Sequence, residues 1–171
     1  SPASASWTVD TVVPETTITS APSGSVSSTS ATFSFSSSES GGYFKWKVNT
    51  GNWVNWSPTT ITFDDDFPDG SYTFHVMAVD SAGNVDPSPA TVTWTVDTTV
   101  PNTTITSAPS GSASSTSATI EFTSNESGVT FQSKLDSGSW TSATSPLSLT
   151  GLSQGSHTIE VRATDVAGNT D

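Results

Sequence analysis

The sequence predicts an all-β protein made of two tandem copies of one β-sandwich module. Three observations predict this fold class: the chain repeats itself, its apolar residues alternate with polar ones over short runs, and turn-forming residues separate those runs. The apolar spacing of three and four that predicts helices is absent. The 171 residues are enough for two small domains, each with a buried core.

The internal repeat is the strongest of these signals. Residues 18–25 (ITSAPSGS) recur as residues 105–112, at a spacing of 87. From Gly70 and Gly155 onward the spacing is 85. The same acidic turn occurs in both repeats, first as AVDSAGNVD and then as ATDVAGNTD. A unit of this length is a common size for a small β-domain.

Within each repeat, the apolar residues have the period of a strand with one buried face. In the first repeat the alternating residues are Phe33 and Phe35, then Phe44, Trp46 and Val48, then Tyr72, Phe74, Val76 and Ala78. In the second they are Ile120 and Phe122, then Phe131 and Leu135, then Ile159, Val161 and Ala163. About seven short strands per repeat, separated by turns, predict an immunoglobulin-like sandwich.

Several motifs resemble the bacterial immunoglobulin-like repeats of large surface proteins. They are VDTTVP (96–101), the GxW motifs at 51–53 and 138–140, LTGLSQGSHT (149–158) and the AxDxAGN turns. The resemblance covers nearly the whole chain. It implies an extracellular or cell-surface location and a role as a stalk, an adhesin segment or a linker between catalytic domains.

The repeat also divides the chain. Residues 11–97 form the first repeat, and residues 98–171 form the second, which lacks its own last strand. Residues 1–10 match residues 88–97, the closing strand of the first repeat. We expect residues 1–10 to form a closing-type strand that belongs to, or is donated to, a neighbouring module.

The expected interface is formed by Ser1, Pro2, Trp7 and Val9, with Trp7 as a buried anchor. A sandwich that lacks a strand exposes unpaired edges and invites a strand from a neighbour. The alternative is that the chain is a window of a longer covalent array, in which the next strand follows residue 171. Under both alternatives the partners are copies of the chain or adjacent repeats, arranged head to tail in a filament, a pilus-like fibre or an adhesin stalk.

The acidic turns predict a calcium site in each repeat. In an immunoglobulin-like sandwich, the segment that leads into the first strand and two of the loops meet at one end. The first set is Asp10, Glu39, Asp80, Asn84 and Asp86; the second is Asp97, Glu126, Asp165, Asn169 and Asp171. Calcium binds six to eight oxygen ligands with loose geometry. The alternative needs no metal: Gly83 and Gly168 supply a positive φ, and Asp80 and Asp165 bond nearby amides in an Asx turn.

Charge and composition exclude several function classes. Sixteen acidic residues against four basic ones give a net charge of -12, which repels nucleic acid. No apolar stretch approaches the roughly 20 residues that cross a bilayer, so we expect no membrane insertion. The chain has no cysteine, which excludes disulfides and thiolate metal sites.

No catalytic motif is present, so we expect the chain not to be an enzyme. A solvent cleft that holds His75 or His157 beside a carboxylate would indicate catalysis instead. Trp53 and Trp56 leave a second alternative, a carbohydrate-binding accessory module of an extracellular enzyme, with surface glycans as partners. Asn55, Asn102 and Asn125 lie in glycosylation sequons.

Overall fold

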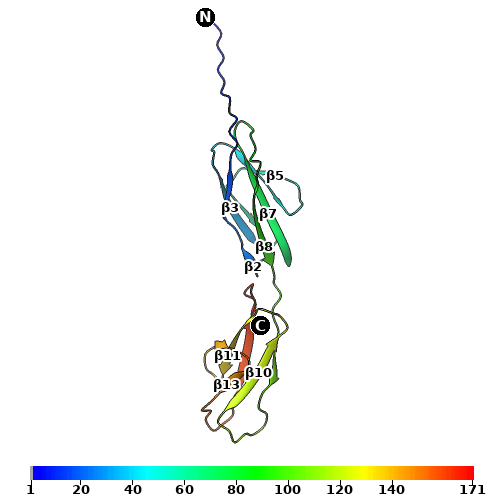
Figure 1. Cartoon of the computed structure of the whole chain (residues 1–171), viewed down its shortest axis with the longest axis vertical. Helices are drawn as coiled ribbons and strands as arrows, with labels where there is room; N and C mark the ends of the chain where they lie inside the picture. The colour runs from blue at the N-terminus through cyan, green and yellow to red at the C-terminus, as the bar shows by residue number, and fades with distance from the viewer. Residues whose placement is uncertain (1) are drawn as a thin grey trace. The chain divides into compact units, whose positions relative to one another are not determined.

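The computed structural model describes residues 2–171, which form two compact units, the first ending at Asp97 and the second running from Thr98 to Asp171 (Figure 1). Within these residues all regular secondary structure is β-strand, which confirms the predicted all-β fold class. Over the same residues, no helix has the length and apolar character to cross a bilayer.

The first unit is a sandwich of two sheets. Its strands are β1 (Thr16–Ser20), β2 (Gly24–Val26), β3 (Ala31–Ser37), β4 (Tyr43–Val48), β5 (Val54–Trp56), β6 (Thr60–Phe63), β7 (Gly70–Val79) and β8 (Ala90–Val96). One sheet has the order β1-β3-β6, and the other has the order β2-β8-β7-β4-β5. All these pairs are antiparallel except that of β2 with β8, which is parallel. The segment before β3 therefore contributes one strand to each sheet.

The core of the first unit lies between the two sheets, where the alternation predicts it. Phe33 on β3 and Phe74 on β7 are fully buried, and their rings stack with centroids 4.1 Å apart. Trp94 and Val96 on β8 are buried in the same cluster. Aromatic rings supply much of this core, because each one buries a large apolar area.

The second unit is a smaller sandwich. Its strands are β9 (Thr103–Ser107), β10 (Ala118–Ser124), β11 (Thr130–Leu135), β12 (Thr141–Ala143), β13 (Leu147–Leu149) and β14 (Ile159–Thr164). The sheets have the orders β13-β10-β9 and β12-β11-β14. Ile120, Phe122 and Ala163 are its buried hydrophobic residues among those described.

The second unit has no counterpart of β2 or β8 in the part of the chain that the structure describes. In the first unit β7 lies between β4 and β8, whereas β14 pairs with β11 alone. Within the described residues, β14 therefore lies at the edge of its sheet.

Residues 2–10 form no strand and are exposed. The side chain of Trp7 is 82% exposed and that of Val9 is 77% exposed. Pro2 is exposed as well, and Ser1 lies outside the described residues. That these residues complete a neighbouring module remains a prediction.

Candidate functional site

The turn after β7 is organised by one carboxylate. Oδ1 of Asp80 accepts hydrogen bonds from the backbone N–H groups of Ala82, Gly83 and Asn84, at 2.9, 2.7 and 2.8 Å. Oδ2 accepts a fourth bond from the Asn84 side chain at 2.7 Å. Gly83 has a φ of 96°, which favours glycine because it has no Cβ. The Asx-turn alternative is therefore present in the structure.

The second repeat builds the same turn from the same residue types. Oδ1 of Asp165 accepts bonds from the N–H groups of Gly168 and Asn169 at 2.7 and 2.8 Å, and Oδ2 accepts one from the Asn169 side chain at 2.8 Å. Gly168 also has a φ of 96°. The AGN sequence is thus repeated because the same turn is built twice.

Three carboxylates of the first unit converge beside this turn. Asp10 comes from the segment before β1, Glu39 from the loop between β3 and β4, and Asp80 from the turn after β7. One carboxylate oxygen of each lies within 4.8 Å of the others. The side chain of Asn84 also donates to the backbone oxygen of Asp10, at 3.2 Å, and so holds the leading segment against the turn. We call Asp10, Glu39 and Asp80 the acidic trio.

The charges of the acidic trio act on one another. Burial, followed by the negative charges of Asp10 and Asp80, raises the pKa of Glu39 above its ordinary value. Burial also acts to raise the pKa of Asp80, but the hydrogen bonds from Asn84, Gly83 and Ala82 hold that pKa below its ordinary value. The hydrogen bonds therefore favour the anionic form of Asp80, whereas burial and the neighbouring negative charges disfavour the anionic form of Glu39.

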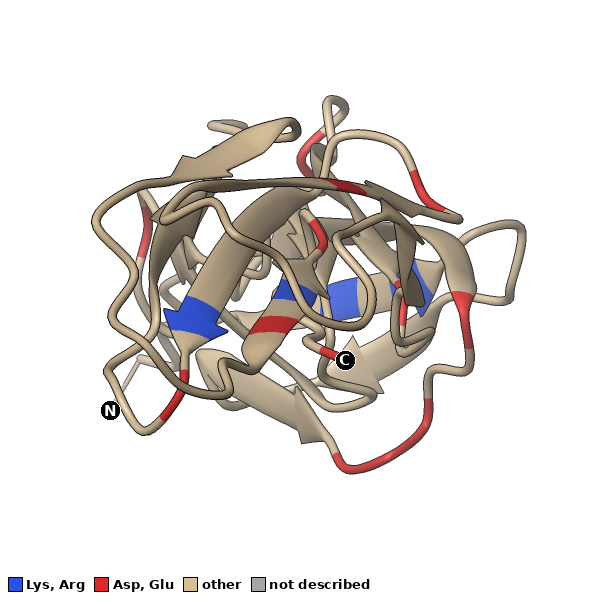
Figure 2. Cartoon of the chain, turned by 90° about the horizontal axis from the view of Figure 1, so that it is seen from below, with Lys and Arg blue, Asp and Glu red and all other residues tan. Residues whose placement is uncertain are grey.

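Three converging carboxylates are a suitable start for a calcium site, which takes oxygen ligands from carboxylates, backbone carbonyls and water. The basic and acidic residues of the chain lie on different elements. Lys45, Lys47, Lys134 and Arg162 all lie on strands, whereas most acidic residues lie in loops (Figure 2).

Asp86 has a different environment from the trio, although the sequence places it in the same set. It is buried, and its oxygens accept bonds from the N–H of Thr16 at 2.9 Å and from the N–H and Oγ of Ser88 at 2.8 and 3.0 Å. Asp171 does the same in the second repeat, with bonds from the N–H groups of Thr103 and Ala163, both at 2.6 Å. Both carboxylates tie the turn to the first strand of their repeat.

The second predicted set draws on both units. Asp97 is the last residue of the first unit, whereas Glu126 and Asp165 belong to the second. Burial acts to raise the pKa of Asp165, but hydrogen bonds from Asn169, Gly168 and Ala167 lower it, as at Asp80. Calcium binding by this set remains a prediction.

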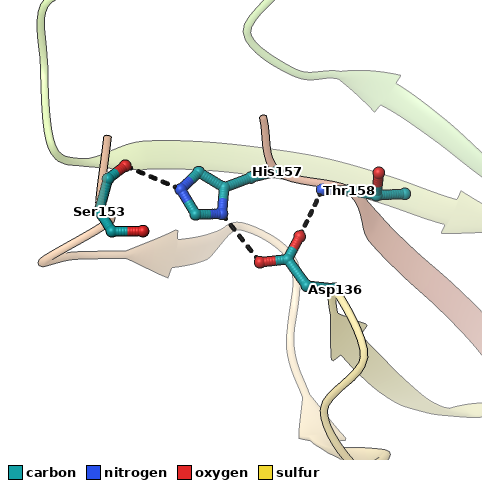
Figure 3. Close-up of polar contacts among 4 residues, drawn as sticks. All are labelled: Asp136, Ser153, His157 and Thr158. Atoms are coloured by element: carbon teal, nitrogen blue, oxygen red, sulfur yellow. Dashed lines mark hydrogen bonds and ion pairs between the residues drawn. The ribbon is translucent and has the colours of Figure 1, made fainter. Parts of the chain in front are cut away.

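The structure also shows a contact that sequence reasoning missed, between His157 and Asp136 (Figure 3). Nδ1 of His157 lies 2.8 Å from Oδ2 of Asp136, and Nε2 lies 3.0 Å from the backbone oxygen of Ser153. Both neighbours of the ring are acceptors, so only the protonated imidazole, with two N–H groups, satisfies both. The pKa of His157 is raised accordingly, first by the bond to Asp136 and then by the bond to Ser153.

This arrangement does not match a catalytic triad. In a triad, the second ring nitrogen accepts the proton of a nucleophile. Here Nε2 of His157 faces a backbone carbonyl, and the Ser153 hydroxyl is not its partner. An imidazolium that donates a hydrogen bond from each ring nitrogen has no lone pair with which to act as a base.

Trp53 and Trp56, the candidate sugar-binding residues, have different surroundings. The ring of Trp53 is covered on one side by Lys47, whose Nζ lies 5.1 Å from the ring centroid. Trp56 is half-buried, and its Nε1 donates to the backbone oxygen of Thr60 at 3.0 Å.

Solved structures with a similar arrangement of strands are fibronectin(III)-like and related β-sandwich modules. The fibronectin(III)-like modules of Clostridium thermocellum CbhA match with a TM-score of 0.56 at 18% identity, over 91% of this chain and 88% of that one. The FN1-FN3 domains of chicken CNTN1 match with a TM-score of 0.46 at 17% identity, over 91% of this chain and 62% of that one. The CbhA similarity establishes the fold as an immunoglobulin-like β-sandwich. No protein-family model matches the sequence, and no curated protein is significantly similar to it.

Proposed function

We propose that this chain is a non-catalytic, structural segment of an extracellular protein, in which β-sandwich repeats placed in series act as a stalk or spacer. The observation that carries the proposal is that two successive units share part of their strand pairing and the same acidic turn. The orders β1-β3-β6 and β7-β4-β5 of the first unit recur as β9-β10-β13 and β14-β11-β12 in the second. Arrays of this kind gain length by adding units, and their stability is roughly a sum over the units and their neighbours. The resemblance to bacterial immunoglobulin-like surface repeats supports an extracellular location and a filament or adhesin stalk.

The test is single-molecule pulling on the whole chain held between two handles. A spacer is expected to lengthen in two discrete steps, one for each unit. A pull-down against insoluble polysaccharides supplies the competing readout. Retention of the chain that Trp53→Ala abolishes would replace the spacer with the carbohydrate-binding alternative.

We further propose that the acidic trio binds calcium. Asp10 belongs to the segment that leads into the first unit, so an ion held by the trio would tie this segment to two loops of the sandwich. Burial raises the pKa of Glu39 most, followed by the negative charges of Asp10 and Asp80, and a cation would offset the repulsion from those charges. We propose that Asn84 and Asn169 hold the two acidic turns in shape.

The calcium proposal is tested by thermal unfolding in excess calcium and in excess chelator. An ion that binds only the folded state stabilises it by about 2.7 kcal/mol at a hundredfold excess over its dissociation constant. We expect Glu39→Gln to remove the calcium response of the first unit, and Asp66→Asn, an exposed acid outside the trio, to keep it. Identical melting curves with calcium and chelator would rule the proposal out.

A further inference from the structure

The strand β5 of the first unit has an open side. It ends the sheet β2-β8-β7-β4-β5, and no strand of the described residues pairs with its outer side. Its inner side pairs with β4, where Asn55 lies opposite Lys45 and Val54 lies opposite Trp46. The outer side of an edge strand presents backbone N–H and C=O groups without a ladder partner, so it is a template for a further strand.

The side chains at this edge are apolar and exposed. Trp53 is 37% exposed and Val54 is 44% exposed. Natural edge strands are commonly protected by charged side chains or by proline, and residues 53–56 contain neither. Exposed apolar area therefore lies directly beside backbone groups that can pair with another chain.

Two lysines lie beside β5 on the outer face of the sheet. Lys45 and Lys47 of β4 alternate with Phe44, which is buried in the core. Among the described residues, neither amine forms an ion pair with a carboxylate. Lys47 lies opposite His75, and burial followed by the positive charge of Lys47 lowers the pKa of His75. The charge of Lys47 is therefore felt by a neutral neighbour and is not balanced by an acid.

The equivalent edge of the second unit is more polar. There β12 ends its sheet and pairs with β11, as β5 pairs with β4. The repeat replaces Val54 by Thr141 and keeps the tryptophan as Trp140. Trp140 is half-buried, and Cζ of Arg162 lies 4.3 Å from its ring centroid. The combination of an open edge with exposed apolar side chains is therefore particular to β5.

The lysine charge also differs between the two units. Lys134 of β11 is the equivalent of Lys47, and its Nζ lies 2.9 Å from Oε1 of Glu160. Glu160 occupies the position of His75, directly opposite the lysine on the neighbouring strand. The second unit thus balances this lysine with its own acid, whereas the first unit leaves the charge for a partner to balance.

We propose that β5 is a docking site for an acidic, extended segment of another protein, which joins the sheet as a strand beside β5. Backbone hydrogen bonds supply affinity in this mode of binding, and alternate side chains supply specificity. Acidic side chains of the segment lie on the face that carries Lys45 and Lys47, and apolar ones lie on the face of Val54. A glycan would use the lysines but not the backbone edge. The inference goes beyond the proposed function, because it gives the spacer a partner.

The first test is an NMR titration of the whole chain with a short peptide in which glutamate and valine alternate. Amide shifts are expected at β5 and β4, and binding should weaken as salt is added, because salt screens exposed charges. A peptide with lysine in place of glutamate should not bind. A glutamate–valine peptide that is N-methylated at alternate residues lacks the N–H groups for pairing and should not bind either.

The second test transfers residues of the second unit to the first. Lys45→Gln installs the residue type of position 132 and should weaken peptide binding by about twofold to fivefold, the range of an exposed ion pair. His75→Glu gives Lys47 an acid of its own chain and should weaken binding at least as much. Thr62→Glu makes the same charge change on the other sheet and is the matched control, which should bind as the parent chain does.

Absence of binding by the glutamate–valine peptide would overturn the inference, and so would binding that N-methylation leaves unchanged. An oligogalacturonate that shifts the same amides and binds more tightly than the peptide would replace the acidic segment with an acidic glycan. Equal losses in His75→Glu and Thr62→Glu would show that net charge alone is the cause, which also contradicts the site. Failure of the docking site would leave the spacer function standing, because that function is tested by stepwise unfolding.

Discussion

His157 occupies in the second unit the position that Tyr72 occupies in the first. The hydroxyl of Tyr72 donates to the backbone oxygen of Pro68 at 2.6 Å, and Nε2 of His157 reaches the equivalent oxygen of Ser153. A second residue of this hydrogen-bond network also differs between the repeats. Asn49, which accepts from the N–H of Thr73, is replaced by Asp136, which accepts from the N–H of Thr158. The hydrogen-bond network is therefore neutral in the first unit, where Tyr72 and Asn49 form it, and charged in the second, where His157 and Asp136 form it. We call these four residues the corner of each unit.

The charged corner makes the stability of the second unit depend on pH. The pKa of His157 is raised above 6.5, so its contribution is fully present below that value and is lost as the pH rises through the raised pKa. His157→Tyr and Asp136→Asn, which restore the residues of the first unit, should both flatten this dependence. Urea unfolding at several pH values, followed by NMR of residues in β14, measures it. An unchanged slope in both variants would contradict the assignment.

Asp86 is expected to contribute to stability through hydrogen bonds. Burial acts to raise its pKa, but the bonds from Thr16 and Ser88 lower it, so its contribution is lost as the pH falls through the lowered pKa. Asp86→Ala leaves the buried N–H of Thr16 without an acceptor and should lower the free energy of unfolding by about 1–3 kcal/mol. Chemical denaturation at neutral pH measures this loss, and Asp66→Ala should show almost none.

Residue roles were only partly predictable from sequence. The topological rule that loops gather at one end of a sandwich correctly placed Asp10, Glu39 and Asp80 near one another. The same rule could not show that Asp86 has a different role. The carboxylate of Asp86 is buried and bonded to backbone amides, and this depends on the path of the chain after the turn. The partner of His157 was missed since Asp136 lies 21 residues away along the chain.

At the scale of elements, β8 packs onto the core of the first unit through Trp94, whose ring contacts those of Phe33, Phe67 and Tyr72. Trp94→Ala should destabilise the first unit by about 3–5 kcal/mol, the usual range for truncating a buried tryptophan. Trp94→Phe should cost much less, because Nε1 of Trp94 is buried without a hydrogen-bond partner. Denaturation followed by tryptophan fluorescence tests both, with Trp53→Ala as the control. Equal effects of the two Trp94 substitutions would argue against ring packing as the cause.

Strands with a clear alternation, such as β3, β4 and β7, could be predicted, because one face of each is buried. The strands β2, β5, β12 and β13 have only three residues each, too few to show a period. The parallel pairing of β2 with β8 could not be foreseen, since it arises when one segment contributes to both sheets.

At the scale of the whole molecule, the net charge of -12 makes like-charge repulsion a general feature, and the acidic trio concentrates it. The pKa of Glu39 is raised, so the stability of the first unit should fall as the pH rises through it. In chelator at neutral pH, Glu39→Gln should therefore raise the melting midpoint. Glu15→Gln, outside the trio, should leave it nearly unchanged, and a lower midpoint for Glu39→Gln would contradict the repulsion.

The first unit has two segments of nearly the same sequence that suit one position, β8 and residues 2–10. Repeat proteins can misassemble in this situation, when the wrong copy inserts first. Val92 on β8 corresponds to Ala5, and the extra methyl groups favour β8 by about 1 kcal/mol. The connection from β7 to β8 spans only residues 80–89, so this hairpin closes with a small entropic penalty. Early hairpin closure therefore favours insertion of β8, the strand adjacent in sequence, during folding.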